Sequence, residues 1–354
     1  MRVFQQTQNT GITGKRLTLD NQTTAMNEKV LVLGAGSWAT ALVKMLSENL
    51  DHIGWYMRRE EQARYIETHR HNPDYLSQVE FDVEKLHITT RIDQAVEEYE
   101  YLIIAIPSAF LHGEISKINT PLSGKYIISA VKGIVPENGL IVGEYFHKHY
   151  AVPYSRIAVI TGPCHAEEVA MERLSYLTVA STGEELVQRI SGMLRSEYIK
   201  VTPSDDIVGT EYAAVLKNIY ALAAGIAHGL GYGDNYQAVL MSNAIREMKR
   251  FTKKIWKTKR DIDKSAYLGD LLVTGYSVFS RNRTFGNMIG QGYSVRSAMM
   301  ELKMVAEGYY ATKSAYEMNK KLKARTPIID AVYRILYRND SPVKVFKALS
   351  DQLD

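Results

Sequence analysis

The stretch VLVLGAGSWATAL, residues 30–42, joins an expected buried strand, a glycine turn and the start of an expected helix. Gly34 allows a tight turn, and Gly36 lets the backbone approach a pyrophosphate. The small Ala39 lets strand and helix pack closely, and the N-terminus of the expected helix, Ser37–Asn49, faces the phosphates. This Gly-x-Gly-x-x-Ala spacing between a strand and a helix predicts a dinucleotide-binding turn. A glycine turn that binds no ligand is the alternative.

Further strand-like runs follow, and helix-like stretches separate most of them. They predict a mostly parallel sheet that is covered on both faces. With residues 29–33 at the start, the runs are 52–57, 101–107, 125–131, 156–161, 176–181 and 198–202.

After Pro203 the pattern changes to apolar residues at helical spacing, which predicts an all-helical region. The fold class is therefore α/β, with a Rossmann-type, mostly parallel sheet domain followed by an all-α C-terminal domain. We expect a dinucleotide-binding domain over 26–204 and a helical substrate and catalytic domain over 205–354. The clearest helical stretches are Asp206–Leu230, Asn235–Trp256, Val305–Met318 and Ile328–Tyr337.

Composition and charge narrow the class of protein. The chain has 354 residues, 45% of them hydrophobic and 23% charged, which is typical of a folded protein with a sizeable core. The 43 basic and 39 acidic side chains nearly balance, which argues against a dedicated nucleic-acid binder. Cys164 is the single cysteine, so no internal disulfide forms and a cytoplasmic location is expected. No apolar run reaches the roughly 18 residues that a membrane span needs.

The first 25 residues are polar and lack the apolar core of a secretory signal. They faintly resemble an organelle transit peptide but have no amphipathic apolar face. We expect a disordered tail, or an extension from an upstream start codon with Met26 as the true beginning.

Several charged residues lie where a ligand of such a sheet binds, beyond the carboxyl ends of the strands. Arg58 follows the second strand, where an arginine can accept the 2′-phosphate of NADP; a solvated helix start is the alternative. Lys132 directly follows the run 125–131, where a cation can meet an anionic substrate, although an exposed strand-end lysine is as common.

Lys217 heads the apolar stretch LKNIYALAAGIAHGLG, residues 216–231, with alanines on its helical face. It is either a surface lysine whose ammonium snorkels to water or a lysine that takes part in catalysis. Asp270 and Thr274 are four residues apart and share one face if helical, and Arg281 with Asn282 follows in a loop-like segment. Together these residues predict a cleft for a small anionic carbonyl compound.

Six segments, taken together, resemble the NAD(P)-dependent glycerol-3-phosphate dehydrogenase family in its bacterial form. The resemblance runs in order from Met26 to about residue 340. The segments are GAGSWATAL (34–42), SAVKGI (129–134), ITGPCHAEEVA (160–170), LKNIYALAAGI (216–226), GDLLVTGYSVFSRNR (269–283) and VAEGYYA (305–311).

The resemblance implies reversible reduction of dihydroxyacetone phosphate to sn-glycerol 3-phosphate with NAD or NADP as cofactor, for phospholipid synthesis. It also implies a homodimer, with no metal, nucleic acid or membrane span involved. By position, Lys217 matches the catalytic lysine. The substrate-binding positions of the family correspond here to Lys132, Gly162, Cys164, Lys217, Asp270, Ser280, Arg281 and Asn282. Thr274 corresponds to a polar residue of the same segment. Cofactor contacts match Gly34, Gly36, Ser37, Trp38, Arg58, Lys132, Ala166, Arg281, Val305 and Glu307.

The chain departs from the family pattern at Cys164, where serine or threonine is usual, at His165, where an aromatic residue is common, and at Gly275, where cysteine is usual. Three other functions compete. A 3-hydroxyacid dehydrogenase would take a carboxylate substrate. The basic run 249–260 could bind nucleic acid, although such runs are usually solvated helix faces. Cys164 and His165 could form a nucleophile–base pair, although adjacent side chains rarely face each other.

Overall fold

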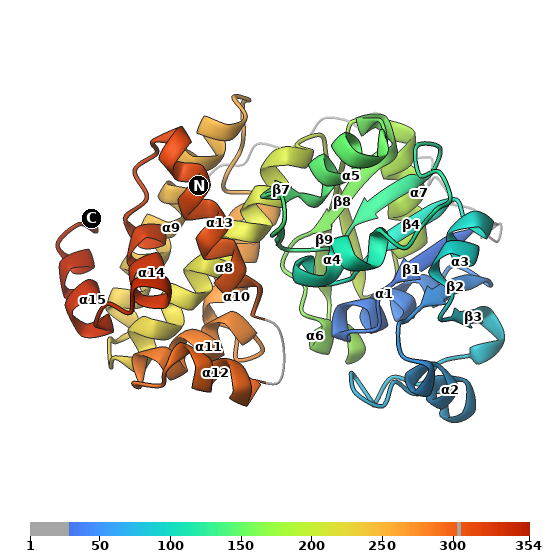
Figure 1. Ribbon diagram of the computed structural model, residues 1–354, viewed down its shortest axis with the longest axis horizontal. Coiled ribbons are helices and arrows are strands. Elements are labelled where there is room, and N and C mark those ends of the chain that lie inside the picture. The colour runs from blue at the N-terminus through green and yellow to red at the C-terminus, as the bar shows by residue number, and fades with distance from the viewer. Residues whose placement is uncertain (1–27, 303–305) are drawn as a thin grey trace, which may run out of the picture.

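A computed structural model describes residues 28–302 and 306–354 of the chain. The predicted N-terminal tail, residues 1–25, and the predicted cofactor contact Val305 lie outside these ranges. Figure 1 shows the two parts of the described structure. A sheet with helices on both faces lies at the right of the picture, and a group of packed helices lies at the left.

An eight-stranded sheet forms the first part, in the order β10-β9-β8-β5-β4-β1-β2-β3. Strand β1 lies between β4 and β2 and is parallel to both. Only the β8–β9 pairing is antiparallel, so the predicted mostly parallel sheet is confirmed. The strands are β1 Val30–Leu33, β2 Ile53–Tyr56, β3 Leu86–Thr89, β4 Tyr101–Ile104, β5 Tyr126–Ser129, β8 Ile157–Thr161, β9 Ser175–Ser181 and β10 Ile199–Ser204.

Each face of the sheet has its own apolar core, because alternate strand residues point to opposite faces. Val30 and Val32 pack into one core with α1, α2, α6 and α7, whereas Leu31 and Leu33 pack into the other with α3, α4 and α5. The helices are α1 Ser37–Ser47, α2 Glu60–His69, α3 Ile92–Glu98, α4 Ser108–Ile115, α5 Val142–Tyr150, α6 Ala166–Ala170 and α7 Glu184–Leu194. The 3₁₀ turns Val83–Lys85 and Tyr154–Arg156 and a small hairpin, β6 Ile134–Val135 with β7 Leu140–Ile141, complete this part.

The second part is built around one long buried helix, α8 (Ile207–Gly229), which carries Lys217 in its middle rather than at its head. The expected position of Lys217 at the start of a helix is wrong, because the helix begins ten residues earlier, at Ile207, directly after its N-cap Asp206. The other helices are α9 Asp234–Ile255, α10 Asp270–Tyr276, α11 Arg281–Gly290, α12 Val295–Leu302, α13 Glu307–Leu322, α14 Pro327–Arg338 and α15 Pro342–Ser350. A π-helix, Ser265–Gly269, precedes α10.

Glycine lets α8 and α11 approach closely. A Cβ added at Gly225 would lie 2.0 Å from the carbonyl oxygen of Arg283, and one at Gly286 would lie 2.2 Å from that of Leu222. The alanines on the helical face of Lys217 are buried in the packing of α8, and none of them lines a described cavity. They are Ala213, Ala214, Ala221 and Ala224.

The sheet ends at Ser204 and α8 begins at Ile207. The division into domains at 203–206 stays a prediction.

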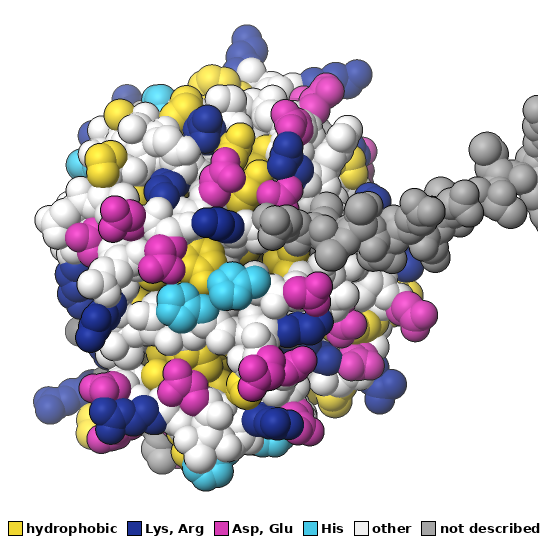
Figure 2. Space-filling view, turned by 90° about the vertical axis from the view of Figure 1, so that its right-hand side faces the viewer, with side chains coloured by type: hydrophobic (Ala, Val, Ile, Leu, Met, Phe, Trp, Pro, Cys, Tyr) yellow, Lys and Arg dark blue, Asp and Glu magenta, His cyan; other side chains and the backbone are white. Residues whose placement is uncertain are grey.

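Within residues 28–302 and 306–354, no helix is both long enough and apolar enough to cross a bilayer. Figure 2 views the end of the sheet part, where basic and acidic side chains are interspersed.

The basic run 249–260 forms the last two turns of α9 and the segment after it. Its Phe251 is buried in the helical core, while Lys253 and Lys254 are exposed. Arg260 forms an ion pair with Asp206 and is almost fully buried. The run is therefore an amphipathic helix end with the side chains of Phe251 and Arg260 buried in the interior.

Candidate active site

The glycine turn between β1 and α1 has the shape that a pyrophosphate needs. Gly34 has φ +129°, and a Cβ there would lie 2.8 Å from the carbonyl oxygen of Ala105. A Cβ at Gly36 would meet nothing within 4 Å, so the backbone is open at this point. Gly36 is also the N-cap of α1, and no side chain caps this helix. The free N–H groups at this helix end suit the phosphates of a dinucleotide.

Two adjoining cavities lie next to this turn. The first measures about 200 Å³, and both parts of the chain line it. The second measures about 490 Å³ and shares Ser37, Pro107, Arg281 and Glu307 with the first. Gly36 lines the second cavity. The predicted site residues that line the first are Ser37, Trp38, Lys132, Cys164, Ala166, Lys217, Asp270, Ser280, Arg281, Asn282 and Glu307, together with Thr274.

Lys217 and Asp270 form a buried ion pair in the wall of the first cavity. The two residues are only 4% and 1% exposed. Thr161, at the end of β8, donates a second hydrogen bond to the Asp270 carboxylate over 3.4 Å. Burial lowers the pKa of Lys217 to about 7, although Asp270 opposes the shift and Lys132 adds to it. Asp270 thus favours the charged form of the ammonium, but desolvation outweighs this attraction, so the net shift of the Lys217 pKa is downward.

Lys132 is held beside this pair by contacts with both parts of the chain. Its ammonium nitrogen lies 5.1 Å from the ring centre of Trp38, as in a cation–π contact. Its carbonyl oxygen accepts a hydrogen bond of 2.8 Å from the side chain of Asn218, the neighbour of Lys217 on α8. Two lysines from different elements thus face one cavity, which favours an anionic ligand.

The Ser-Arg-Asn segment begins a helix, so the expected loop at Arg281 and Asn282 is wrong. Ser280 is the N-cap of α11, and its hydroxyl accepts a hydrogen bond from the N–H of Arg283 over 3.3 Å. The guanidinium of Arg281 donates a hydrogen bond to the hydroxyl of Ser37 in α1. The side-chain oxygen of Asn282 accepts the N–H of Gly308 at 2.9 Å, which leaves its amide N–H₂ group to face the cavity.

Glu307, at the start of α13, joins the two parts of the chain. Its carboxylate accepts hydrogen bonds from the backbone N–H of Ser108, at 2.9 Å, and from the Ser108 hydroxyl. The contact depends on Gly133, because a Cβ there would lie 2.3 Å from the Ser108 hydroxyl oxygen and 2.4 Å from a Glu307 carboxylate oxygen. Burial raises the pKa of Glu307.

Gly162 and Cys164 form the turn after β8. Gly162 has φ +114°, and a Cβ there would lie 2.7 Å from the carbonyl oxygen of Tyr176. Burial raises the pKa of the Cys164 thiol to about 11 and lowers the pKa of His165 to about 4. Both groups are therefore neutral near pH 7, which argues against a nucleophilic cysteine with a histidine base.

Arg58 lies just beyond β2 and is exposed, and it lines neither described cavity. Its neighbour Arg59 is paired with Asp74.

Sequence reasoning missed three site residues, Ser108, Thr161 and Asn218. Ser108 begins α4, four residues after β4 ends at Ile104, so its position just beyond a strand end is the one signal that could have identified it.

The fold and the cavity together define the class of protein. A dinucleotide turn on a Rossmann-type sheet, next to a cavity in which a helical region places a buried lysine, defines a nicotinamide-dependent dehydrogenase. Comparison with known families then identifies the dehydrogenase family to which the chain belongs. Residues 29–187 match the model of the NAD-dependent glycerol-3-phosphate dehydrogenase N-terminus, and residues 206–347 match that of its C-terminus. The chain belongs to the NAD-dependent glycerol-3-phosphate dehydrogenase family.

Individual relatives agree with this assignment. The glycerol-3-phosphate dehydrogenase [NAD(P)+] of Bacillus licheniformis is 36% identical, and the match covers 87% of this chain and 90% of that protein. The enzyme of the same name from Limosilactobacillus reuteri is 33% identical over 92% of this chain and 98% of that one. The crystal structure of glycerol-3-phosphate dehydrogenase from Coxiella burnetii has a TM-score of 0.84 and 27% identity, covering 91% of this chain and 98% of that chain.

Proposed function

We propose that this protein catalyses the reversible reduction of dihydroxyacetone phosphate to sn-glycerol 3-phosphate with NADH or NADPH. The observation that carries the proposal is the buried Lys217–Asp270 pair in a cavity beside the dinucleotide turn. The names of the relatives support both the substrate and the cofactor.

The residues around the glycine turn fit a nicotinamide dinucleotide. Gly34 and Gly36 give the close backbone approach, and the N-terminus of α1 offers its free N–H groups to the pyrophosphate. When bound, the cofactor supplies the hydride for the carbonyl carbon or accepts it in the reverse direction. Ser37, Trp38, Lys132, Ala166, Arg281 and Glu307 line the space where the rest of the cofactor would be held. Arg58 would bind the 2′-phosphate of NADP. The contact of Val305 with the cofactor stays a prediction.

Lys217 acts as the general acid for reduction and as the general base for oxidation. The carbonyl oxygen gains negative charge as the carbon is reduced, and it must also gain a proton. The ammonium of Lys217 supplies that proton, and its pKa of about 7 makes both protonation states accessible near neutral pH. Asp270 orients the ammonium, and Lys132 adds a second positive charge that stabilises the developing alkoxide.

The phosphate of the substrate is bound at the start of α11. Arg281 offers the N–H groups of its guanidinium that Ser37 does not use, and Asn282 offers its amide N–H₂ group. The N-terminus of the same helix adds a favourable dipole. Gly162, Cys164 and Ser280 contact the remainder of the substrate, with Cys164 acting as a neutral thiol.

We also propose the wider setting that the family resemblance implies. The chain has a dinucleotide-binding domain over 26–204 and a catalytic domain over 205–354. The protein is a cytoplasmic homodimer that supplies glycerol 3-phosphate for phospholipid synthesis. The single cysteine supports the location, and light scattering of the purified protein tests the dimer.

A spectrophotometric assay of dihydroxyacetone phosphate with NADH and with NADPH tests the proposed activity. Keto acids serve as the competing substrates, because they are what a 3-hydroxyacid dehydrogenase would reduce. Cofactor oxidation with the ketone phosphate supports the proposal. Oxidation only with keto acids contradicts it.

A further inference from the structure

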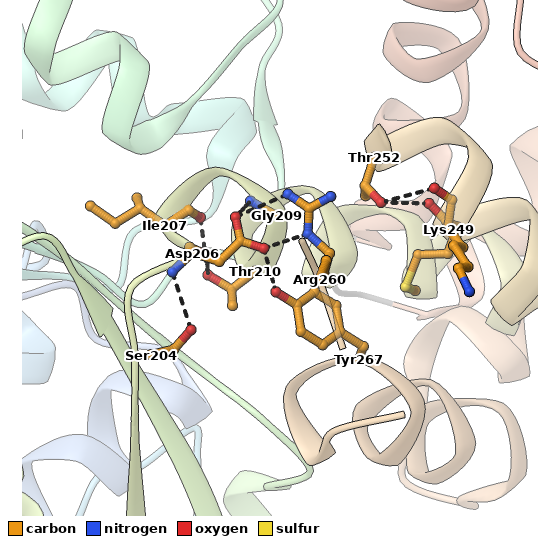
Figure 3. Close-up of polar contacts among 10 residues, drawn as sticks. Ser204, Asp206, Ile207, Gly209, Thr210, Lys249, Thr252, Arg260 and Tyr267 are labelled. Atoms are coloured by element: carbon orange, nitrogen blue, oxygen red, sulfur yellow. Dashed lines mark hydrogen bonds and ion pairs between the residues drawn. The ribbon is translucent and has the colours of Figure 1, made fainter. Parts of the chain in front are cut away.

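Asp206 joins the start of α8 to the segment 260–267, at the point where the chain leaves the sheet (Figure 3). One carboxylate oxygen accepts hydrogen bonds from the N–H of Gly209, at 2.9 Å, and from the guanidinium of Arg260, at 3.0 Å. The other accepts the hydroxyl of Tyr267 at 2.6 Å and a second N–H of Arg260. We call Asp206, Arg260 and Tyr267 the junction cluster.

The junction cluster is largely removed from water, so its contacts are not those of a weak surface ion pair. The side chains of Arg260 and Asp206 are 6% and 12% exposed, and Tyr267 is buried. Although burial opposes ionisation, Arg260 and Tyr267 hold the pKa of Asp206 below its usual value. The carboxylate is therefore charged and fully bonded near neutral pH.

Tyr267 lies in the π-helix Ser265–Gly269, which runs directly into α10 at Asp270. One-turn π segments are rare and often lie at functional sites. This one also rests on the turn after β8, because a Cβ on Gly269 would lie 3.6 Å from the ring of Pro163. The position of Asp270 therefore depends on how the π-helix is held.

Asp206 is also the N-cap of α8, the helix that carries Lys217 about three turns further on. One carboxylate thus holds the start of the helix that bears Lys217 and the π-helix that leads to Asp270. The two members of the catalytic ion pair are tied together at a point outside the cavity, since none of the junction cluster lines it.

We propose that Tyr267 and Arg260 are positioning residues that act through Asp206 to set the geometry of the Lys217–Asp270 pair. This inference rests on the proposed function. Loss of the Tyr267 hydroxyl lets the π-helix shift relative to α8, so Asp270 stabilises the ammonium of Lys217 less. The lysine then loses its proton at lower pH, so near neutral pH a smaller fraction of the enzyme carries the proton that the carbonyl oxygen needs.

The test compares Tyr267→Phe with Tyr337→Phe. The control removes an equivalent hydroxyl, which donates a 2.7 Å hydrogen bond to the carbonyl oxygen of Tyr309 elsewhere in the helical part. For Tyr267→Phe we expect kcat for dihydroxyacetone phosphate to fall about tenfold with little change in KM, because small misplacements of catalytic groups cost rate. We expect the loss of kcat with rising pH to move about one unit lower. The groups facing Lys217 are Asp270, Lys132, Cys164 and His165, and all remain in the variant.

A second readout needs no turnover. The pH dependence of acetylation of Lys217, followed by mass spectrometry on the full chain, reports its pKa directly. We expect a lower pKa in Tyr267→Phe and in Arg260→Lys, which also serves if the first variant does not fold, and an unchanged pKa in Tyr337→Phe.

Unchanged pH profiles and acetylation midpoints in both junction variants would overturn the inference, even if their melting temperatures fall. Equal shifts in the Tyr337→Phe control would overturn it as well, since the effect would then be general destabilisation. A wild-type protein that does not reduce dihydroxyacetone phosphate contradicts the proposed function instead. In that case the acetylation midpoints alone decide whether the junction cluster sets the pKa of Lys217.

Discussion

The guanidinium of Arg281 donates a hydrogen bond to the hydroxyl of Ser37, a residue 244 positions earlier in the chain. Ser37 begins α1 beside the glycine turn, and Arg281 begins α11 in the helical part. The arginine that suits a substrate phosphate therefore also touches the dinucleotide turn. A change at Arg281 should be felt by both ligands.

Arg281→Ala should raise the KM for dihydroxyacetone phosphate strongly and affect unphosphorylated dihydroxyacetone much less. Loss of a charge-assisted pair costs on the order of 2–5 kcal/mol of binding free energy. Affinity for NADPH should fall by a smaller factor, because Ser37 loses its partner. Steady-state kinetics with both ketones measure this, and Arg246→Ala, which removes an exposed arginine, is the control. Equal losses for the two ketones would refute phosphate binding by Arg281.

Arg58→Asp should shift the cofactor preference toward NADH. The exposed guanidinium at the end of β2 would attract the 2′-phosphate of NADPH, whereas a carboxylate would repel it. We expect the wild type to use NADPH at least as well as NADH, and the variant to lose about tenfold or more in kcat/KM for NADPH alone. Arg64→Asp changes a charge of the same sign on α2 and should leave the preference unchanged. A wild type that uses only NADH, and is insensitive to Arg58→Asp, would contradict this role.

Glu247 should make the protein less stable as the pH rises. Its buried carboxylate accepts the N–H groups of Ile328 and Ile329 at 2.9 and 3.0 Å, and burial raises its pKa to about 8. Between the unfolded value near 4.5 and about 8, the folded state binds a proton that the unfolded state does not. The free energy of unfolding therefore falls through this window, by on the order of a few kcal/mol.

Urea denaturation at pH 5 and pH 9 measures this effect, and Glu247→Gln should flatten it. Glu211, whose buried carboxylate has a pKa of about 7, contributes with the same sign and remains as a background. A variant with the same pH dependence as the wild type would show that Glu247 is ionised in the folded protein throughout this range.

The fold was largely predictable wherever apolar residues form a continuous run. The sheet core around β1 and the long helix α8 both follow from such runs. Strand β3 was missed because it lies at the sheet edge, where its four residues are only partly buried or exposed, so no apolar run marks it. The start of α11 resembles a loop in the sequence, because Ser280, which caps the helix, cannot be told from a loop serine by its sequence context.

The residues of the site could be named from motifs, but their partners could not. Asp270 was expected near Lys217, yet nothing local in the sequence indicates that Tyr267 reaches Asp206 or that Glu307 reaches Ser108. These contacts join residues 61 and 199 positions apart. The first forms when the π-helix packs beside the start of α8, and the second when the helical part packs against the sheet part.

Lys217 transfers the proton in the proposed mechanism. In Lys217→Ala, Asp270 remains buried without its partner, so some loss of stability is expected. NADPH binding, followed by fluorescence, should persist, because the glycine turn is untouched. Lys217→Arg should not restore activity, since a guanidinium does not release its proton near neutral pH.

The most direct test is kcat for dihydroxyacetone phosphate in a folded Lys217→Ala protein that still binds NADPH. We predict a loss of about a hundredfold or more, the scale expected for a general acid that also stabilises charge. A kcat close to that of the wild type would contradict the mechanism and leave the buried lysine with a structural role alone.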